Sequence, residues 1–126
     1  MSQFLYIAAG AALGANARYL VGVWAGNRWG AFFPFGTLAV NITGSLLLGF
    51  IVALATDRIV ISPEMRLFLA VGFMGSYTTF SSYTVESLSL LQSGAVWPAI
   101  FNIIGNNFLG LTCAILGFAL ARLVGG

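Results

Sequence analysis

A run of hydroxyl-bearing side chains lies in the third apolar stretch of this chain, which reads GSYTTFSSYT from Gly75 to Thr84. Eight of these ten residues carry a hydroxyl. Because such residues compete with or strain helical backbone, we expect a break in the helix there. Two half-helices that meet at membrane depth can direct N–H groups at an anion and free carbonyls at a small cation. The alternative is an unbroken helix whose serines and threonines bond back to their own carbonyls.

Two aromatic residues in this run, Phe80 and Tyr83, are three positions apart. With the backbone broken, both rings can point into one cleft. The edge of an aromatic ring carries partial positive charge, so it can contact an anion without a full charge. An aromatic pair taken alone is more often core packing than an ion site.

Amide side chains recur at membrane depth in the neighbouring apolar stretches. Asn41 lies in GTLAVNITGSLLLG, and Asn102, Asn106 and Asn107 lie in the last stretch. Polar groups inside a membrane usually face a bundle interior or a watery cavity. The alternative is that these amides only bond helices to one another.

Two charged residues also fall within the apolar stretches. Glu86 follows the hydroxyl run, and Arg18 lies in the first stretch. We expect Arg18 to act either as a snorkelling anchor or as a vestibule charge that attracts anions.

The elements that must position these residues follow from composition. The chain has 126 residues, of which 60% are hydrophobic and 6% charged, whereas soluble domains average about 45–50% apolar and about 25% charged residues. Four apolar segments, at approximately 4–26, 36–56, 64–92 and 97–123, each suffice for a span of about 20 residues. We therefore expect an all-α membrane protein with four transmembrane helices, the third broken, in one domain over residues 1–126.

Three prolines, Pro34, Pro63 and Pro98, fall at the segment boundaries, where a missing N–H costs least. Ser62, Pro63 and Glu64 form a typical helix start, with an N-cap, a first helical proline and an acid in the first turn. We predict that a helix begins there.

The scarce polar residues exclude several classes of function. The chain has no histidine, three acidic residues and one cysteine, so we expect neither a metal cluster nor a catalytic triad, and not an enzyme. Five arginines without lysine are too few and too scattered for a nucleic-acid surface.

The arginines give only a weak orientation signal. With the N-terminus on one side, three arginines, Arg58, Arg66 and Arg122, lie near that side. Arg28 and the deeper Arg18 lie toward the other. Since positive charge in short loops sets orientation, we expect the chain to insert both ways. A single four-helix bundle has little room for an aqueous pathway, and chains inserted both ways form an antiparallel dimer that resembles the inverted repeats of transporters.

Small residues recur along the spans and let helices approach closely in lipid. We expect packing contacts at Gly10, Gly14, Ala17, Gly44, Gly49, Gly105 and Gly110.

Three motifs together resemble the Fluc/CrcB family of fluoride channels: GAALGANARY, GTLAVNITGSLLLG and GFMGSYTTFSSYTVES. The resemblance covers nearly the whole chain. It implies a fluoride-selective channel that exports fluoride passively, built as an antiparallel, dual-topology homodimer in the lipid of the inner (plasma) membrane. It also implies two pores per dimer and a structural sodium ion on the two-fold axis.

The resemblance assigns roles to residues of this chain by motif position. Sodium ligands would be the backbone carbonyls of Gly75 and Thr78 from both subunits. The positions matching the fluoride pore are Phe80, Tyr83, Asn41, Ser81 and Asn106, and those matching pore-associated charges are Arg18 and Glu86.

One residue departs from the family pattern. The usual element is Thr-Thr-Phe-Ser-Thr-Phe, and here it ends in Ser-Tyr, so Tyr83 replaces the second phenylalanine. A phenol adds a hydrogen-bond donor, which alters how an anion is held or passed on.

Two other functions are compatible with four spans. A small multidrug-type proton-coupled transporter is also a dual-topology dimer, but it uses an acid deep in the first span, and this first span has none. Glu86 is the only candidate for that role. A membrane scaffold without transport predicts no ion flux.

Overall fold

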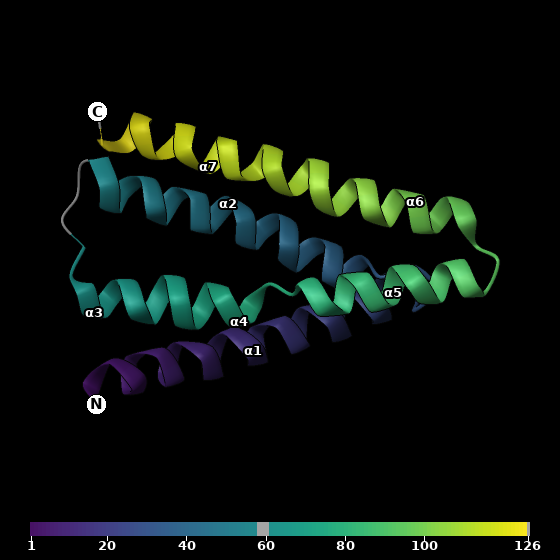
Figure 1. Ribbon diagram of the computed structural model, residues 1–126, viewed down its shortest axis with the longest axis horizontal. Helices are drawn as coiled ribbons and strands as arrows, with labels where there is room; N and C mark the ends of the chain where they lie inside the picture. Colours follow the sequence, from purple (N-terminus) through teal and green to yellow (C-terminus); the bar gives the residue numbers. More distant parts are fainter. Residues whose placement is uncertain (58–60, 126) are drawn as a thin grey trace.

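The residues that the computed structural model describes, 1–57 and 61–125, are mostly helical, and short non-helical segments such as 30–34, 78–79 and 93–95 separate the helices (Figure 1). Two segments, η1 and η2, are π-helical stretches continuous with their α-helical neighbours. In chain order the elements are α1 (Ser2–Trp29), α2 (Phe35–Asp57), α3 (Pro63–Arg66), η1 (Leu67–Met74), α4 (Gly75–Tyr77), α5 (Phe80–Gln92), α6 (Val96–Ile104), η2 (Gly105–Leu109) and α7 (Gly110–Gly125).

Four helical rods form from these elements, and each matches one predicted apolar segment to within a few residues. Three are uninterrupted and both long and apolar enough to cross a membrane: α1, α2 up to Thr56, and the continuous helix from Val96 to Val124. The other rod, Pro63–Gln92, is divided between α4 and α5. The prediction of an all-helical, multi-pass membrane protein is confirmed.

The third rod begins where the sequence predicts. Ser62 adopts an extended backbone and its hydroxyl accepts a hydrogen bond from the Met65 N–H at 3.1 Å. Pro63 occupies the first turn, and Glu64 lies beside the positive end of the helix dipole.

The predicted break in the third rod is present and lies within the hydroxyl run, at Thr78 and Thr79. Gly75 is helical, with φ −61° and ψ −31°. Thr78 and Thr79 are extended, with φ/ψ of −85°/160° and −151°/120°. Two β-branched residues in succession suit this conformation, and the Thr79 hydroxyl caps α5 by accepting from the Ser82 N–H. The unbroken-helix alternative is therefore wrong.

The rods lie alongside one another in pairs (Figure 1). Helix α1 packs along η1 and α4, α2 along α7, and α5 along α6. The N- and C-termini lie at the same end of the bundle (Figure 1). This arrangement places the break beside α1 and α2.

Glycines allow the closest approaches between rods. A Cβ atom at Gly14 would clash with the backbone carbonyl of Phe73, and one at Gly117 would clash with that of Leu46. Gly10, Gly44 and Gly49 lie in similarly tight contacts, as predicted. Gly117 belongs to the same class although the sequence interpretation omitted it.

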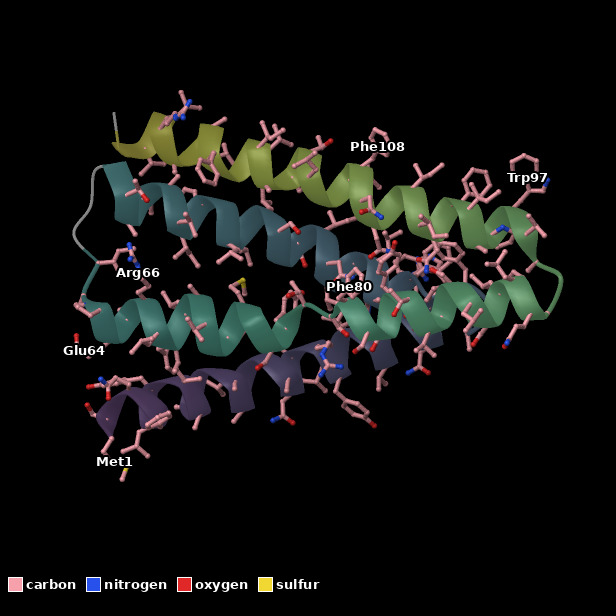
Figure 2. All side chains as sticks on the ribbon, viewed as in Figure 1. Met1, Glu64, Arg66, Phe80, Trp97 and Phe108 are labelled. Atoms are coloured by element: carbon pink, nitrogen blue, oxygen red, sulfur yellow. The ribbon has the colours of Figure 1, made fainter. Side chains whose placement is uncertain are left out.

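The core of the single chain is thin. Val40 and Asn102 are the largest fully buried side chains, whereas apolar residues such as Phe4 and Leu123 are 71% and 80% exposed. Figure 2 shows large apolar side chains, Phe108 and Trp97 among them, projecting from the outside of the bundle. Such a surface suits lipid or a second copy of the chain.

The arginines divide between the two ends of the bundle. Arg66 lies at the end shared with Met1 (Figure 2), and Arg122 is in the last turn of α7. Arg28 is in the last turn of α1, toward the opposite end. Arg58 lies outside the described residues.

Candidate functional site

The helix break is held open by an amide on the neighbouring α2. The Thr79 N–H donates to Asn41 Oδ1 at 2.8 Å, and Asn41 Nδ2 donates to the Thr79 carbonyl at 3.1 Å. A single side chain thus satisfies both backbone groups of an extended residue at membrane depth, where unpaired groups are costly.

The break deprives the carbonyls of residues 75–78, Gly75 and Thr78 among them, of their usual helical donors. The Thr79 N–H, which would reach back to Gly75 in a continuous helix, is directed to Asn41. The Ser82 N–H, which would reach Thr78, is directed to the Thr79 hydroxyl at 3.2 Å. Gly75 and Thr78 are the two residues whose carbonyls the motif resemblance predicts as sodium ligands.

A chain of side-chain hydrogen bonds extends from the break into the last rod. Asn41 donates to Asn106 Oδ1 at 2.7 Å, and Asn106 donates to the backbone carbonyl and Oδ1 of Asn102 at 2.8 and 3.0 Å. Asn102 is fully buried and donates to Ser87 Oγ at 2.9 Å, and Ser87 donates to the Tyr83 carbonyl at 2.8 Å. These hydrogen bonds link α2, α5 and the last rod. They agree with the alternative that the amides bond helices to one another.

A cavity of about 260 Å³ lies beside the break. Four of the five predicted pore residues line it: Asn41, Phe80, Tyr83 and Asn106. The rings of Phe80 and Tyr83 meet edge to face, with centroids 5.5 Å apart and planes at 71°. Phe80, labelled beside the break in Figure 2, is 77% exposed in the single chain, so core packing within one subunit does not account for it.

Comparison with known proteins identifies the family of this chain. A family model described as CrcB-like protein, Camphor Resistance (CrcB), matches residues 5–118. The chain belongs to the CrcB-like family. The resemblance seen in the motifs is confirmed.

Curated relatives of this CrcB-like chain carry a functional name. Three proteins named Fluoride-specific ion channel FluC, from Chloroflexus aurantiacus, Roseiflexus sp. and Maridesulfovibrio salexigens, are each 44% identical to it. The matches cover 100%, 97% and 98% of this chain and 100%, 98% and 98% of the relatives. These names describe ion channels and not enzymes.

One predicted pore residue of the CrcB-like chain lies apart from this cavity. Ser81 is exposed, and its hydroxyl is 3.5 Å from that of Thr79. Ser81 is not among the described residues that line the cavity.

Sequence reasoning missed several cavity residues of the CrcB-like chain, among them Ser45, Thr79 and Asn107. Ser45 stands four positions after Asn41 on α2, so helical periodicity places both on one face. That spacing was a usable signal. Thr79 lines the cavity because its backbone is bonded to α2. Its position in the hydroxyl run does not reveal that contact.

Arg18 contacts the other side of the break. Its Nε donates to the Ser76 carbonyl at 3.0 Å, near the C-terminal end of the first half-helix. A cation there complements the negative end of the helix dipole. Arg18 also lines a second cavity, of about 460 Å³, together with Thr79 and Ser82.

Glu86 of the CrcB-like chain lies on α5, facing α2. One carboxylate oxygen, Oε2, accepts a hydrogen bond from the Thr37 hydroxyl at 3.0 Å. The other, Oε1, is buried and has no hydrogen-bond partner among the described residues. Within residues 1–57 and 61–125, no three His, Cys, Asp or Glu side chains group as a metal site.

Proposed function

We propose that this chain forms a fluoride-selective channel that exports fluoride passively. The observation that carries the proposal is its relationship, over the full length, to proteins named fluoride-specific ion channels. The cavity at the break supports it, because the predicted aromatic and amide residues converge there from separate rods.

The chemistry of this cavity suits a small, strongly hydrated anion. A selective path must replace the water shell of the ion, yet hold it weakly enough for exit. Hydroxyl groups, amides and ring edges line the cavity, and none of its lining residues within the described part of the chain is charged. The pore residues in this proposal are Phe80, Tyr83, Asn41, Ser81 and Asn106, and the pore-associated charges are Arg18 and Glu86.

The functional unit in this proposal is an antiparallel homodimer in the inner (plasma) membrane, with one pore per subunit. The thin core of one chain and the exposure of Phe80 support burial against a second copy. The arginines at both ends of the bundle support insertion in both orientations.

A structural sodium ion on the two-fold axis belongs to the same proposal. The Gly75 and Thr78 carbonyls fit this role because their usual helical donors bond elsewhere. Two such oxygens from each subunit are ligands of the kind that hard cations take. Bound sodium supplies positive charge that offsets repulsion among the carbonyls and links the subunits.

The experiment that tests the function is flux from liposomes loaded with potassium fluoride or potassium chloride. We expect fluoride efflux, read by an ion-selective electrode, to require a potassium ionophore and to leave chloride inside. Efflux should proceed without a proton gradient. Obligatory proton coupling would support the multidrug-type transporter, and absence of all flux would support the scaffold.

A further inference from the structure

The amide hydrogens beside the cavity are already donated within the protein. Asn41 gives its two to the Thr79 carbonyl and to Asn106 Oδ1. Asn106 gives its two to the carbonyl and Oδ1 of Asn102. An anion in the cavity needs hydrogens that are not engaged in this way, so the hydroxyl groups of the lining are the available donors.

The hydroxyls of the cavity differ in availability. Thr78 Oγ1 donates to the Met74 carbonyl at 3.0 Å, so its hydrogen is engaged. The Tyr83 oxygen instead receives a hydrogen bond, from Asn107 Nδ2 at 3.0 Å. Among the described residues the Tyr83 hydroxyl has no acceptor, and its hydrogen is available to a ligand in the cavity.

The orientation of Asn107 follows from a second contact. Asn107 Nδ2 also lies 2.8 Å from the Ile103 carbonyl oxygen, which can only accept. The nitrogen, and not Oδ1, must therefore face both Ile103 and Tyr83. Because an amide nitrogen only donates, the Tyr83 oxygen is fixed as an acceptor and its single hydrogen must point elsewhere.

We infer that Asn107 is a positioning residue for anion passage, acting through Tyr83. It holds the phenol as an acceptor, so that the hydroxyl hydrogen is presented to the anion, and the bond it donates polarises that hydroxyl. The edge-to-face contact with Phe80 limits rotation of the Tyr83 ring. The inference rests on the proposed fluoride function and applies to a chain with tyrosine where the family motif has phenylalanine.

The test is a double-mutant cycle of Asn107→Leu and Tyr83→Phe, measured as fluoride efflux per reconstituted protein. We expect Asn107→Leu to slow fluoride efflux by about two- to tenfold in the wild-type background, as loss of one hydrogen bond implies. In the Tyr83→Phe background, the same substitution should have no further effect. Asn107→Ala, measured in parallel, removes the donor without adding a branched side chain. It serves as the test variant if Asn107→Leu does not fold.

Asn16 offers a matched control. Its Nδ2 donates to the carbonyl four residues earlier, Ala12, just as Asn107 does to Ile103, but its only side-chain bond within the described residues is that one. Asn16→Leu should leave the rate unchanged.

A spectroscopic measurement separates this inference from the proposed function. Ultraviolet resonance Raman spectra of tyrosine report whether a phenol donates or accepts, and subtracting the Tyr83→Phe spectrum isolates Tyr83. We expect an acceptor signature that Asn107→Leu removes, and a donor signature that appears on adding sodium fluoride. These signals need no flux, so a failure of fluoride transport is distinguishable from a failure of the Asn107 role.

Three results would overturn the inference. The first is equal slowing by Asn107→Leu in both backgrounds, which would show that Asn107 acts through packing. The second is no effect of the substitution in either background. The third is a Tyr83 Raman signal that does not respond to the loss of Asn107.

Discussion

The Asn41 side-chain amide pairs with the backbone of Thr79 in the way that a neighbouring β-strand would. It accepts from the Thr79 N–H and donates to the Thr79 carbonyl. The Thr79 N–H and carbonyl both bond to the Asn41 amide, at 2.8 and 3.1 Å. The break in the third rod is therefore stabilised by α2, a helix that lies earlier in the chain.

Removal of the amide should destabilise the fold. Asn41→Ala leaves two backbone groups unpaired at membrane depth, and each such group costs about 1–3 kcal/mol. We expect a lower melting temperature in detergent and strongly reduced fluoride flux. Thr56→Val, which removes a polar bond on the same helix far from the break, should melt near the wild type. Equal melting of the two variants would contradict the role of Asn41.

Substitution of Phe80 separates a pore role from a packing role. Phe80→Leu keeps apolar bulk but removes the positive ring edge, so we expect fluoride flux per folded protein to fall about tenfold or more. If Phe80 only packs, the swap costs about 1–2 kcal/mol of stability and little flux. Tyr83→Phe keeps its ring and should still conduct. Full flux in folded Phe80→Leu protein would count against the ring-edge mechanism.

Loss of the Arg18 contact should weaken the first half-helix. Arg18→Gln removes the cation beside the Ser76 carbonyl, and hydrogen bonds to charged groups contribute about 1.5–3 kcal/mol. We expect a lower midpoint of denaturation. Arg28→Gln, in the last turn of α1, is the charge-matched control. Indistinguishable midpoints for the two variants would show that the Arg18 contact contributes nothing.

Sodium should remain with the purified protein. Carbonyls of both subunits would enclose the ion, so we expect it to exchange slowly when sodium is replaced by a bulky organic cation. Elemental analysis of the dimer peak measures the retained metal. Protein that is free of sodium yet dimeric and conducting would contradict the structural-ion proposal.

Both orientations should occur in the membrane. Cysteine labelling of a tag at the C-terminus, with and without permeabilisation, should find comparable populations on each side. The reason is the weak arginine asymmetry between the two ends. A single orientation in more than about nine of ten chains would leave the antiparallel dimer without support.

The fold was largely predictable because the information is local. Apolar length gave the four spans, and Ser62 with Pro63 gave the start of the third. The hydroxyl run predicted the break and the region in which it lies, and the structure places it at the adjacent β-branched residues Thr78 and Thr79, whereas Gly75 stays helical.

The site was predictable only in part, because hydrogen-bond partners depend on which faces meet. Asn41 and Asn106 stood out as intramembrane amides, but their mutual bond requires the packing of α2 on the last rod. Motif position predicted neither the contact of Arg18 with Ser76 nor that of Asn107 with Tyr83. Such contacts need the tertiary structure.

The bond from Asn41 to Asn106 has a consequence for biosynthesis. Asn41 and Thr79 leave the ribosome well before Asn106, so the break first enters the bilayer with one Asn41 amide hydrogen lacking its partner. The hydrogen-bond chain closes only after the final rod has been translated and inserted. A nascent chain stalled before Asn106 should therefore show faster hydrogen exchange at Thr79 than the released protein, which makes insertion of the last helix the step that locks the broken one.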